Sequence, residues 1–458
     1  MYVNRSLKWA AIAKAPMLRL AAFLLLFAVS GVSHAILPIQ HWQTKSGARV
    51  LFVENHDLPM LDVSVEFPAG GAYDLKERSG LARMTNRVLQ LGAQGMNEDD
   101  IARRLADVGA VMSGRFDTDR GGLAMRTLSS KAEREQALEI FGAVLQRPVF
   151  PDAVLEREKV RVADAIKESN TKPETIAAVN FFRMAFPGHP YGQRLSGEVE
   201  TVAKLTREAL VDFYRKHYVA RHAVVALMGD VTREEAARIA ETLTSALPPG
   251  DAEQPALPPV ADLAQSQSRW VAHPATQSHI LIGAPAIHRT DPDYFPLLVG
   301  NYILGGGGFV SRLMDEVRQK RGLAYSAYSS FSALQRKGPF VIGMQTRRDQ
   351  TEEALKVVEK TLRDFLERGP TEQELAAAKQ NLAGGFPLRI DSNAKIHQYL
   401  AVIGFYRLPL TYLEDFVKNV EQVSAADIRV AFARHIHAGR MVTVVVGTTQ
   451  DKTAQAGE

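Results

Sequence analysis

The alternation of apolar and polar residues predicts β-strands in the first part of the chain. Residues 61–67 (Leu-Asp-Val-Ser-Val-Glu-Phe) alternate with a period of two, and the apolar run 50–53 precedes them across a turn-forming segment. The segment 121–128 predicts a further strand. Apolar residues at helical spacing predict the helices of this half, at residues 80–91, 98–108, 131–146, 151–169 and 173–185.

The segment 205–229 has a counterpart near the C-terminus, at residues 423–447. Each copy predicts a capped helix with a basic residue and a histidine near its end, followed by an apolar strand that stops at a glycine. The shift is constant, since 423 − 205 and 447 − 229 are both 218. This shift is far longer than the repeats of solenoid proteins, so it indicates that a whole domain has been duplicated.

A proline-rich segment separates the two halves. Residues 247–259 hold five prolines, which favour extended geometry and suit a semi-rigid linker. Hairpin strands separated by helical blocks predict an α+β fold of two homologous domains, each a mainly antiparallel sheet with helices packed on one face. The expected organisation is a signal peptide (1–35), an N-terminal domain (36–247), a linker (248–267), a C-terminal domain (268–448) and a tail (449–458).

The first 35 residues differ from the rest of the chain. Four cationic residues precede the apolar run 20–29, and Ser33-His-Ala35 has the small-x-small form of a signal-peptidase site. This order predicts a secretory signal peptide that is cut after Ala35, and hence a periplasmic protein. An uncleaved anchor is the alternative, although the run is shorter than a usual span, and no later stretch is long enough to cross a membrane.

The composition excludes several classes of function. The chain is 46% hydrophobic and 23% charged with a net charge of only +4, which is typical of a globular protein and gives no indication of nucleic-acid binding. It contains no cysteine, so thiolate metal sites and thiol nucleophiles are excluded. The twelve histidines offer no pair at the spacing of a zinc helix, and we expect most of them to be surface or capping residues.

Candidate chemistry follows the glycine run 305–308. An amphipathic helix ends at Gly322, and an aromatic strand starts at Tyr325. We therefore expect Arg318, on the last helical turn, and Tyr325 to reach the same volume, where both could donate hydrogen bonds to a carbonyl oxygen that gains charge. The plain alternative is a surface arginine and a half-buried tyrosine. The glycine run lacks the Lys-Ser/Thr of a phosphate-binding loop, and we interpret it as a turn that lets two helices pack closely.

Several segments resemble the pitrilysin-type (insulinase-type) metallopeptidases, the inverzincins that include insulin-degrading enzyme and mitochondrial processing peptidase. The matching segments are 67–82, 189–192, 197–202 and 305–313. The resemblance covers nearly all of residues 37–448 and is strongest to the short bacterial and processing-peptidase branch. It implies that the two domains form a half-clamshell, and that Arg318 and Tyr325 are the pair by which the family's second domain engages substrate near zinc.

The chain departs from the family in the metal helix. Where the family has His-x-x-Glu-His, this sequence has Arg83-Met-Thr-Asn86-Arg87, and Ala165 aligns with the third ligand, a glutamate. Arginine does not lose its proton in proteins, and two guanidinium groups on one helix face repel a dication. The resemblance therefore implies that this chain binds no metal, and zinc is expected in a partner subunit.

The acidic residues near Ala165 suggest how the two arginines are neutralised. Asp164 and Glu168 lie beside it in sequence, and we expect them to pair with Arg83 and Arg87.

The resemblance implies a division of labour between two subunits. We expect this chain to be the zinc-free subunit of a heterodimeric periplasmic zinc metallopeptidase, inactive on its own. A zinc-bearing homologue would supply the metal, the water and a glutamate base, and this chain would supply Arg318 and Tyr325. The substrate would be an unfolded peptide, bound extended along a sheet edge.

Two other functions are open to this sequence. The chain could be a non-enzymatic peptide-binding or assembly subunit of an envelope complex, with Arg83 and Arg87 forming the positive wall of a pocket for acidic peptides. A self-sufficient peptidase would need metal ligands that the sequence does not show.

Overall fold

The computed structural model describes residues 38–251, 253, 255–448 and 452–455. The predicted signal peptide therefore lies outside the described residues. Residues Ile39–Glu458 form one compact unit. Among the described helices, none has the length and the apolar run needed to cross a bilayer.

The first sheet has six strands, and only one pair of neighbours is parallel. The strand order is β1 (Gln40–Gln43), β2 (Arg49–Glu54), β8 (Val224–Gly229), β3 (Met60–Phe67), β7 (Gly121–Leu128) and β6 (Val111–Phe116). β2 and β8 are parallel, and the other neighbours are antiparallel. The predicted alternation in β3 is correct, but its polar residues are also buried: Asp62, Ser64 and Glu66. A helix from the second half of the chain covers them.

The helices of the first half agree with the predicted ranges to within a few residues where a prediction was made. They are α2 (Leu81–Leu89), α3 (Glu98–Asp107), α4 (Lys131–Gln146), α5 (Asp152–Ser169), α6 (Pro173–Ala185), α7 (Val199–Ala203), α8 (Arg207–His217) and α9 (Arg233–Thr244). The side chain of Asn97 accepts a hydrogen bond from the Asp100 N–H, which makes Asn97 the N-cap of α3.

The second sheet also has six strands with one parallel pair. The strand order is β11 (Ala324–Phe331), β12 (Gly338–Arg347), β10 (Gln277–Ile287), β13 (Val442–Thr448), β9 (Gln267–Ala272) and β14 (Lys452–Gln455). β13 and β9 are parallel, and the other neighbours are antiparallel. The helices that belong to this half are α10 (Tyr294–Asn301), α11 (Thr351–Arg368), α12 (Glu372–Gly384), α13 (Asn393–Tyr406), α14 (Tyr412–Gln422) and α15 (Ala425–His435).

The predicted duplication extends to single hydrogen bonds. α8 and α15 begin 218 residues apart (425 − 207), as do β8 and β13 (442 − 224). His217 at the end of α8 donates from Nδ1 to the carbonyl of Pro68, and His435 at the end of α15 makes the same bond to Ala286, both at 3.1 Å. Pro68 and Ala286 are again 218 residues apart. His217 is therefore a buried structural residue and not the expected surface or capping histidine.

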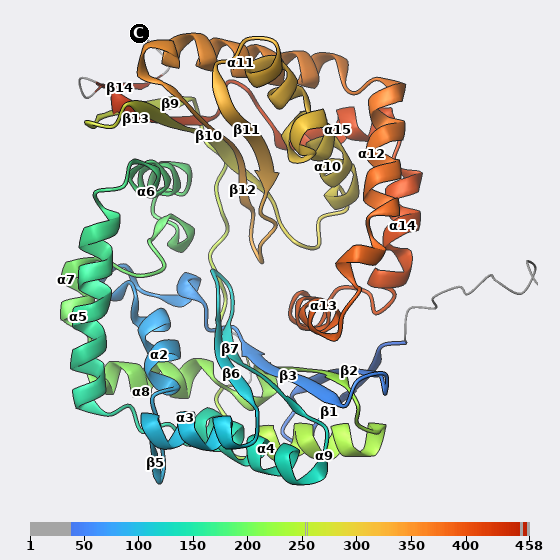
Figure 1. Ribbon diagram of the computed structural model, residues 1–458. Helices are drawn as coiled ribbons and strands as arrows, with labels where there is room; N and C mark the ends of the chain where they lie inside the picture. Colours follow the sequence, from blue (N-terminus) through green and yellow to red (C-terminus); the bar gives the residue numbers. More distant parts are fainter. Residues whose placement is uncertain (1–37, 252, 254, 449–451, 456–458) are drawn as a thin grey trace, which may run out of the picture. The chain divides into compact units, whose positions relative to one another are not determined.

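Two helices are exchanged between the halves. α13 packs on β8, β3 and β2 of the first sheet, and α6 packs on β13 and β10 of the second sheet. Figure 1 shows α13 on one face of the first sheet, with α4 and α9 on the other. Each sheet thus completes its hydrophobic packing with a helix from the other half, which ties the halves into one unit.

A buried carboxylate forms a second connection between the halves. Asp119, in the loop between β6 and β7, accepts hydrogen bonds from the Tyr191 hydroxyl (2.8 Å), the Gln335 N–H (2.7 Å) and the Tyr406 hydroxyl (2.9 Å). Burial raises the pKa of Asp119 although these three donors oppose the shift. Residues from both halves therefore meet at one fully buried group.

The proline-rich segment is anchored to the rest of the chain. Leu257 and Leu263 are buried. The guanidinium of Arg336 donates from Nε and Nη2 to the Leu257 carbonyl, at 3.0 and 2.7 Å. These contacts suit the semi-rigid linker that the prolines predict.

Candidate functional site

The helix α2, which carries the degenerate metal positions, is fixed at its start by a buried acid. Asp74 accepts hydrogen bonds from the N–H groups of Gly80 and Ala82, both at 2.7 Å. A carboxylate here satisfies donors that the first turn of a helix leaves unpaired. Burial raises the pKa of Asp74 to about 7, against the effect of these hydrogen bonds.

Asn86, at the position of the family's catalytic base, is a structural residue. Its side chain is buried and donates from Nδ2 to the Gly122 carbonyl (2.8 Å) and to the Tyr218 hydroxyl (3.2 Å). An amide cannot accept and release a proton as a carboxylate does. The contacts hold α2 against β7 and the end of α8, and they provide no proton transfer.

Arg83 lies on the exposed side of α2. Its guanidinium carbon lies 5.9 Å from the ring centre of Phe116, the last residue of β6. Within the described part of the chain, no carboxylate pairs with Arg83. Partial burial and the nearby positive charge of Arg87 lower the pKa of Arg83.

Arg87 is neutralised by Glu158 on α5. Its Nε donates to Oε2 of Glu158, whose side chain is fully buried. The same carboxylate accepts from Arg157 Nε (3.2 Å) and Arg161 Nη1 (2.7 Å). Burial alone would raise the pKa of Glu158, but the surrounding arginines lower it below its usual value.

The expected pairing of Asp164 and Glu168 with the arginines is wrong. Asp164 pairs with Lys167 at 3.1 Å, and Glu168 pairs with Lys172 at 2.8 Å. Lysines one turn further along are the nearest partners for exposed acids. Glu158 could have been found from its spacing, because it lies seven residues before Ala165 on the same side of α5.

These residues cannot hold zinc. The metal positions carry two guanidinium groups, an amide engaged in hydrogen bonds and the methyl group of Ala165, none of which is a zinc ligand. Among the described residues, one other group could offer three ligand atoms: Asp291, Asp293 and His435. Arg434 already pairs with Asp293 at 2.6 Å, so its guanidinium neutralises one of the two carboxylates in this group.

Arg318 and Tyr325 do come together, as the sequence predicts. Arg318 lies on the π-helical segment η7 (Met314–Gln319). Gly322 reverses the chain with a φ of 64°, and its N–H donates to the Arg318 carbonyl at 2.9 Å. The Arg318 guanidinium carbon then lies 4.7 Å from the ring centre of Tyr325 on β11.

Phe309, which was not among the predicted site residues, completes this group. Its ring centre lies 4.7 Å from the Arg318 guanidinium carbon, so the cation is in contact with two aromatic rings. Phe309 is 63% exposed and Tyr325 is 80% exposed. A phenylalanine next to the glycine run and nine residues before Arg318 was the available signal.

Gly305, the first residue of the glycine run, packs against β11, a contact that the predicted turn between two helices did not include. A Cβ on Gly305 would lie 2.4 Å from the backbone nitrogen of Ser329 on β11. A side chain at this position would therefore separate the turn from the strand. The glycine brings the Phe309 turn close to the strand that carries Tyr325.

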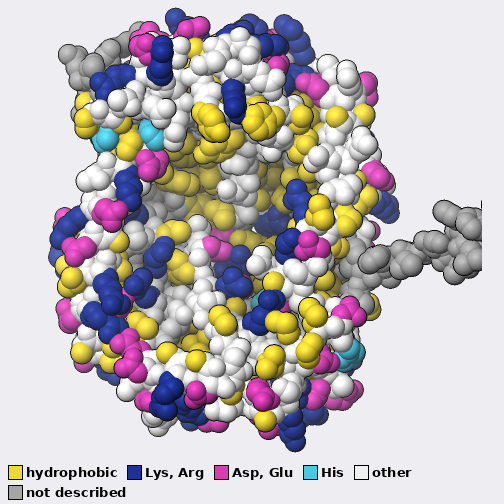
Figure 2. All heavy atoms as spheres, in the orientation of Figure 1, with side chains coloured by type: hydrophobic (Ala, Val, Ile, Leu, Met, Phe, Trp, Pro, Cys, Tyr) yellow, Lys and Arg dark blue, Asp and Glu magenta, His cyan; other side chains and the backbone are white. Residues whose placement is uncertain are grey.

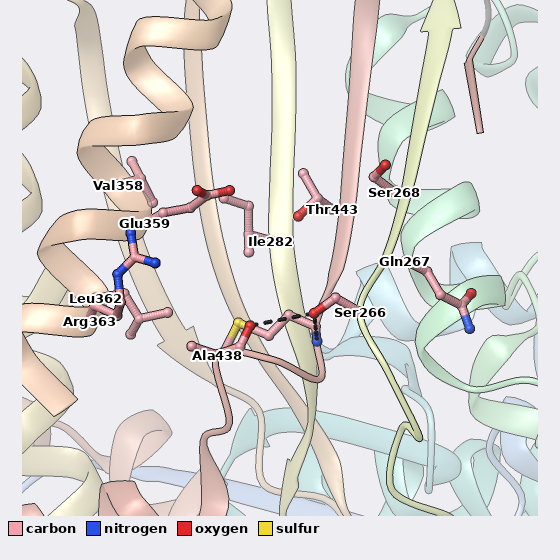
Figure 3. Close-up of a pocket in the computed structure, with 11 residues that line it drawn as sticks. Ser266, Gln267, Ser268, Ile282, Val358, Glu359, Leu362, Arg363, Ala438 and Thr443 are labelled. Atoms are coloured by element: carbon pink, nitrogen blue, oxygen red, sulfur yellow. Dashed lines mark hydrogen bonds between the residues drawn. The ribbon is translucent and has the colours of Figure 1, made fainter. Parts of the chain in front are cut away.

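The molecule has two further hollows of interest. Figure 2 shows a face that is hollowed between the two sheets, with hydrophobic side chains in its depth. A separate cavity of about 350 Å³ lies in the C-terminal half, where Glu359 and Arg363 of α11 face Ile282 and Thr443 of the sheet (Figure 3). Neither Arg318 nor Tyr325 lines this cavity.

Comparison with protein families accounts for both halves of the chain. Residues 49–199 match the model of the insulinase family, peptidase family M16, and residues 204–382 match the peptidase M16 inactive domain. A crystal structure from Pseudomonas fluorescens, described as a peptidase M16 inactive domain, is 36% identical with a TM-score of 0.87. The match covers 90% of this chain and 98% of that one. The chain belongs to peptidase family M16.

Other relatives agree with this assignment. A Helicobacter pylori protein named "Non-peptidase homolog YmxG" is 26% identical over 402 residues, which are 87% of this chain and 91% of the relative. The structure of a protease from the same species is 18% identical with a TM-score of 0.82, over 90% of this chain and all of that one, and shows the same fold. Together with the lost zinc ligands, the match to the inactive-domain model and the relative named a non-peptidase homolog identify the chain as an inactive M16 member.

Proposed function

We propose that this M16 homologue is the zinc-free subunit of a heterodimeric zinc metallopeptidase in the periplasm. The observation that carries the proposal is the stack of Phe309, Arg318 and Tyr325. The cation contacts two exposed rings, and no acid pairs with it in the part of the chain that the structure describes. Such a cation can stabilise a partial negative charge on a molecule that binds from outside the chain.

In this proposal the chain performs binding and charge stabilisation. Arg318 and the Tyr325 hydroxyl donate hydrogen bonds to the scissile carbonyl, or to the peptide carbonyl next to it, as negative charge develops. β11 is an edge strand of the second sheet, so its free main-chain groups can pair with an extended peptide. Zinc, held by the partner, would activate the attacking water. Ser33-His-Ala35 supports export to the periplasm.

Reconstitution with a zinc-bearing homologue tests the proposal. The double variant Arg318→Ala, Tyr325→Phe removes two donors and is expected to lower kcat by at least about 10²–10³-fold, the usual effect of removing one. The complex should still form, as size-exclusion chromatography would show. Unchanged turnover by the variant complex would refute the role of the pair.

A second candidate function is a non-enzymatic peptide-binding subunit. The name of the Helicobacter pylori relative and the arginines at the former metal positions favour it. Affinity purification from the native organism discriminates between the two. A zinc-containing M16 protein in stoichiometric amount supports the peptidase subunit, and its absence supports the binding subunit.

A further inference from the structure

We propose that Arg83 and Arg87 bind carboxylate side chains of an acidic, extended peptide at the place where catalytic M16 members hold zinc. The proposal deepens the peptide-binding part of the proposed function, but it does not depend on a zinc-bearing partner. It specifies the substrate class as peptides rich in aspartate or glutamate.

The charge balance around α2 is the first support. Three arginines of α2 and α5 share two acids, and Arg83 of α2 pairs with neither of them. Arg157 binds Glu98 through two bonds of 2.6 Å, and Glu158 accepts from Arg87, Arg157 and Arg161. Within this ion-pair cluster the three arginines exceed the two acids by one positive charge, and Arg83 adds a cation with no ion-pair partner among the described residues.

The geometry of the two arginines is the second support. Residues 83 and 87 are one helical turn apart on the exposed side of α2, so their side chains lie next to each other. Glu158 anchors Arg87, and the ring of Phe116 lies beside Arg83. Their mutual repulsion contributes to the lowered pKa of Arg83, so an incoming carboxylate would relieve it. Guanidinium groups bind carboxylates through two parallel hydrogen bonds.

The surroundings favour a peptide as the source of the carboxylate. Phe116 ends β6, which is an edge strand with several exposed residues. An extended chain could pair with this edge while one of its side chains reaches Arg83. The aromatic ring also offers apolar contact, which a free inorganic anion would not use.

The test measures binding of fluorescein-labelled peptides to the full chain by fluorescence anisotropy. A glutamate-rich peptide is compared with the same peptide in which glutamine replaces every glutamate. We expect the chain to bind the acidic peptide at least about tenfold more tightly, and Arg83→Gln to remove most of that difference, because hydrogen bonds to charged groups are strong. Arg83 makes no ion pair among the described residues, so this variant should fold.

Arg103→Gln is the matched control, since Arg103 is an exposed helical arginine whose one ion pair among the described residues is with Asp100 on its own helix. Equal loss of affinity in both variants would show non-specific attraction and overturn the proposal. Equal affinity for the two peptides, or complete displacement by inorganic phosphate at the same concentration as the peptide, would also overturn it. Acidic-peptide binding that persists in Arg318→Ala separates this site from the Arg318–Tyr325 pair.

Discussion

At the scale of single residues, Arg318 is positioned by contacts with two aromatic rings. The rings of Phe309 and Tyr325 restrict a side chain that otherwise has many rotamers. This order supports the proposed function, because a hydrogen-bond donor that is already in place loses little entropy when a substrate binds.

Phe309→Ala is expected to weaken catalysis by the reconstituted complex without abolishing it. An exposed cation–π contact contributes about 0.5–1 kcal/mol, so kcat/KM should fall by about two- to fivefold. Phe309→Trp should retain the activity, because tryptophan presents the stronger ring. Val310→Ala, at an exposed neighbouring position, serves as the control. Full activity of Phe309→Ala would mean that Tyr325 alone positions the arginine.

Asn86 illustrates a catalytic position that has become part of the core. Asn86→Ala leaves the Gly122 carbonyl and the Tyr218 hydroxyl without their donor and should lower the free energy of unfolding by about 1–3 kcal/mol. Arg83→Ala, one turn earlier and exposed, should change it by less than about 0.5 kcal/mol. Urea unfolding of the two variants measures the contrast, and equal stability would contradict the structural role.

At the scale of elements, α13 places a titratable side chain against the first sheet. His397 is buried on this helix, and burial lowers its pKa to about 4. The charge of Asp62 raises this pKa, and the charge of Arg115 lowers it. In the unfolded chain the pKa of histidine is about 6.5, so between pH 6.5 and 4 the unfolded state binds more protons than the native state. Lowering the pH therefore reduces the free energy of unfolding, because the unfolded state is stabilised by protonation of His397.

The stability that neutral His397 contributes should be present above pH 6.5 and be lost as the pH falls towards 4. The loss amounts to at most about 3 kcal/mol. Comparison of the wild type with His397→Gln isolates this contribution, because Asp74 and His217 titrate in both. Urea unfolding at pH 7.5 and 4.5 should show that the wild type loses more stability than the variant. An equal loss would refute the assignment.

The elements also show which features the sequence can predict. The helix stop at Gly322 and the strand at Tyr325 depend on local chemistry, and the 218-residue repeat is visible as a pattern, so these were correct. β6 was missed because Gly114 and Arg115 interrupt its apolar pattern. The Glu158 cluster and the exchange of α6 and α13 depend on contacts between residues far apart in sequence, and no local pattern encodes them.

At the scale of the whole molecule, the exchanged helices and the Asp119 network predict that the two halves unfold together. Removing α13 would expose the first sheet, and removing α6 would expose the second, so neither half retains its packing alone. Differential scanning calorimetry should therefore show a single transition.

Asp119→Ala leaves the Tyr191 and Tyr406 hydroxyls and the Gln335 N–H without their acceptor and should lower the Tm by several degrees. Asp349→Asn, at an exposed acid, is the control and should leave the Tm unchanged. Two separate transitions in the wild type would show that the halves are independent domains.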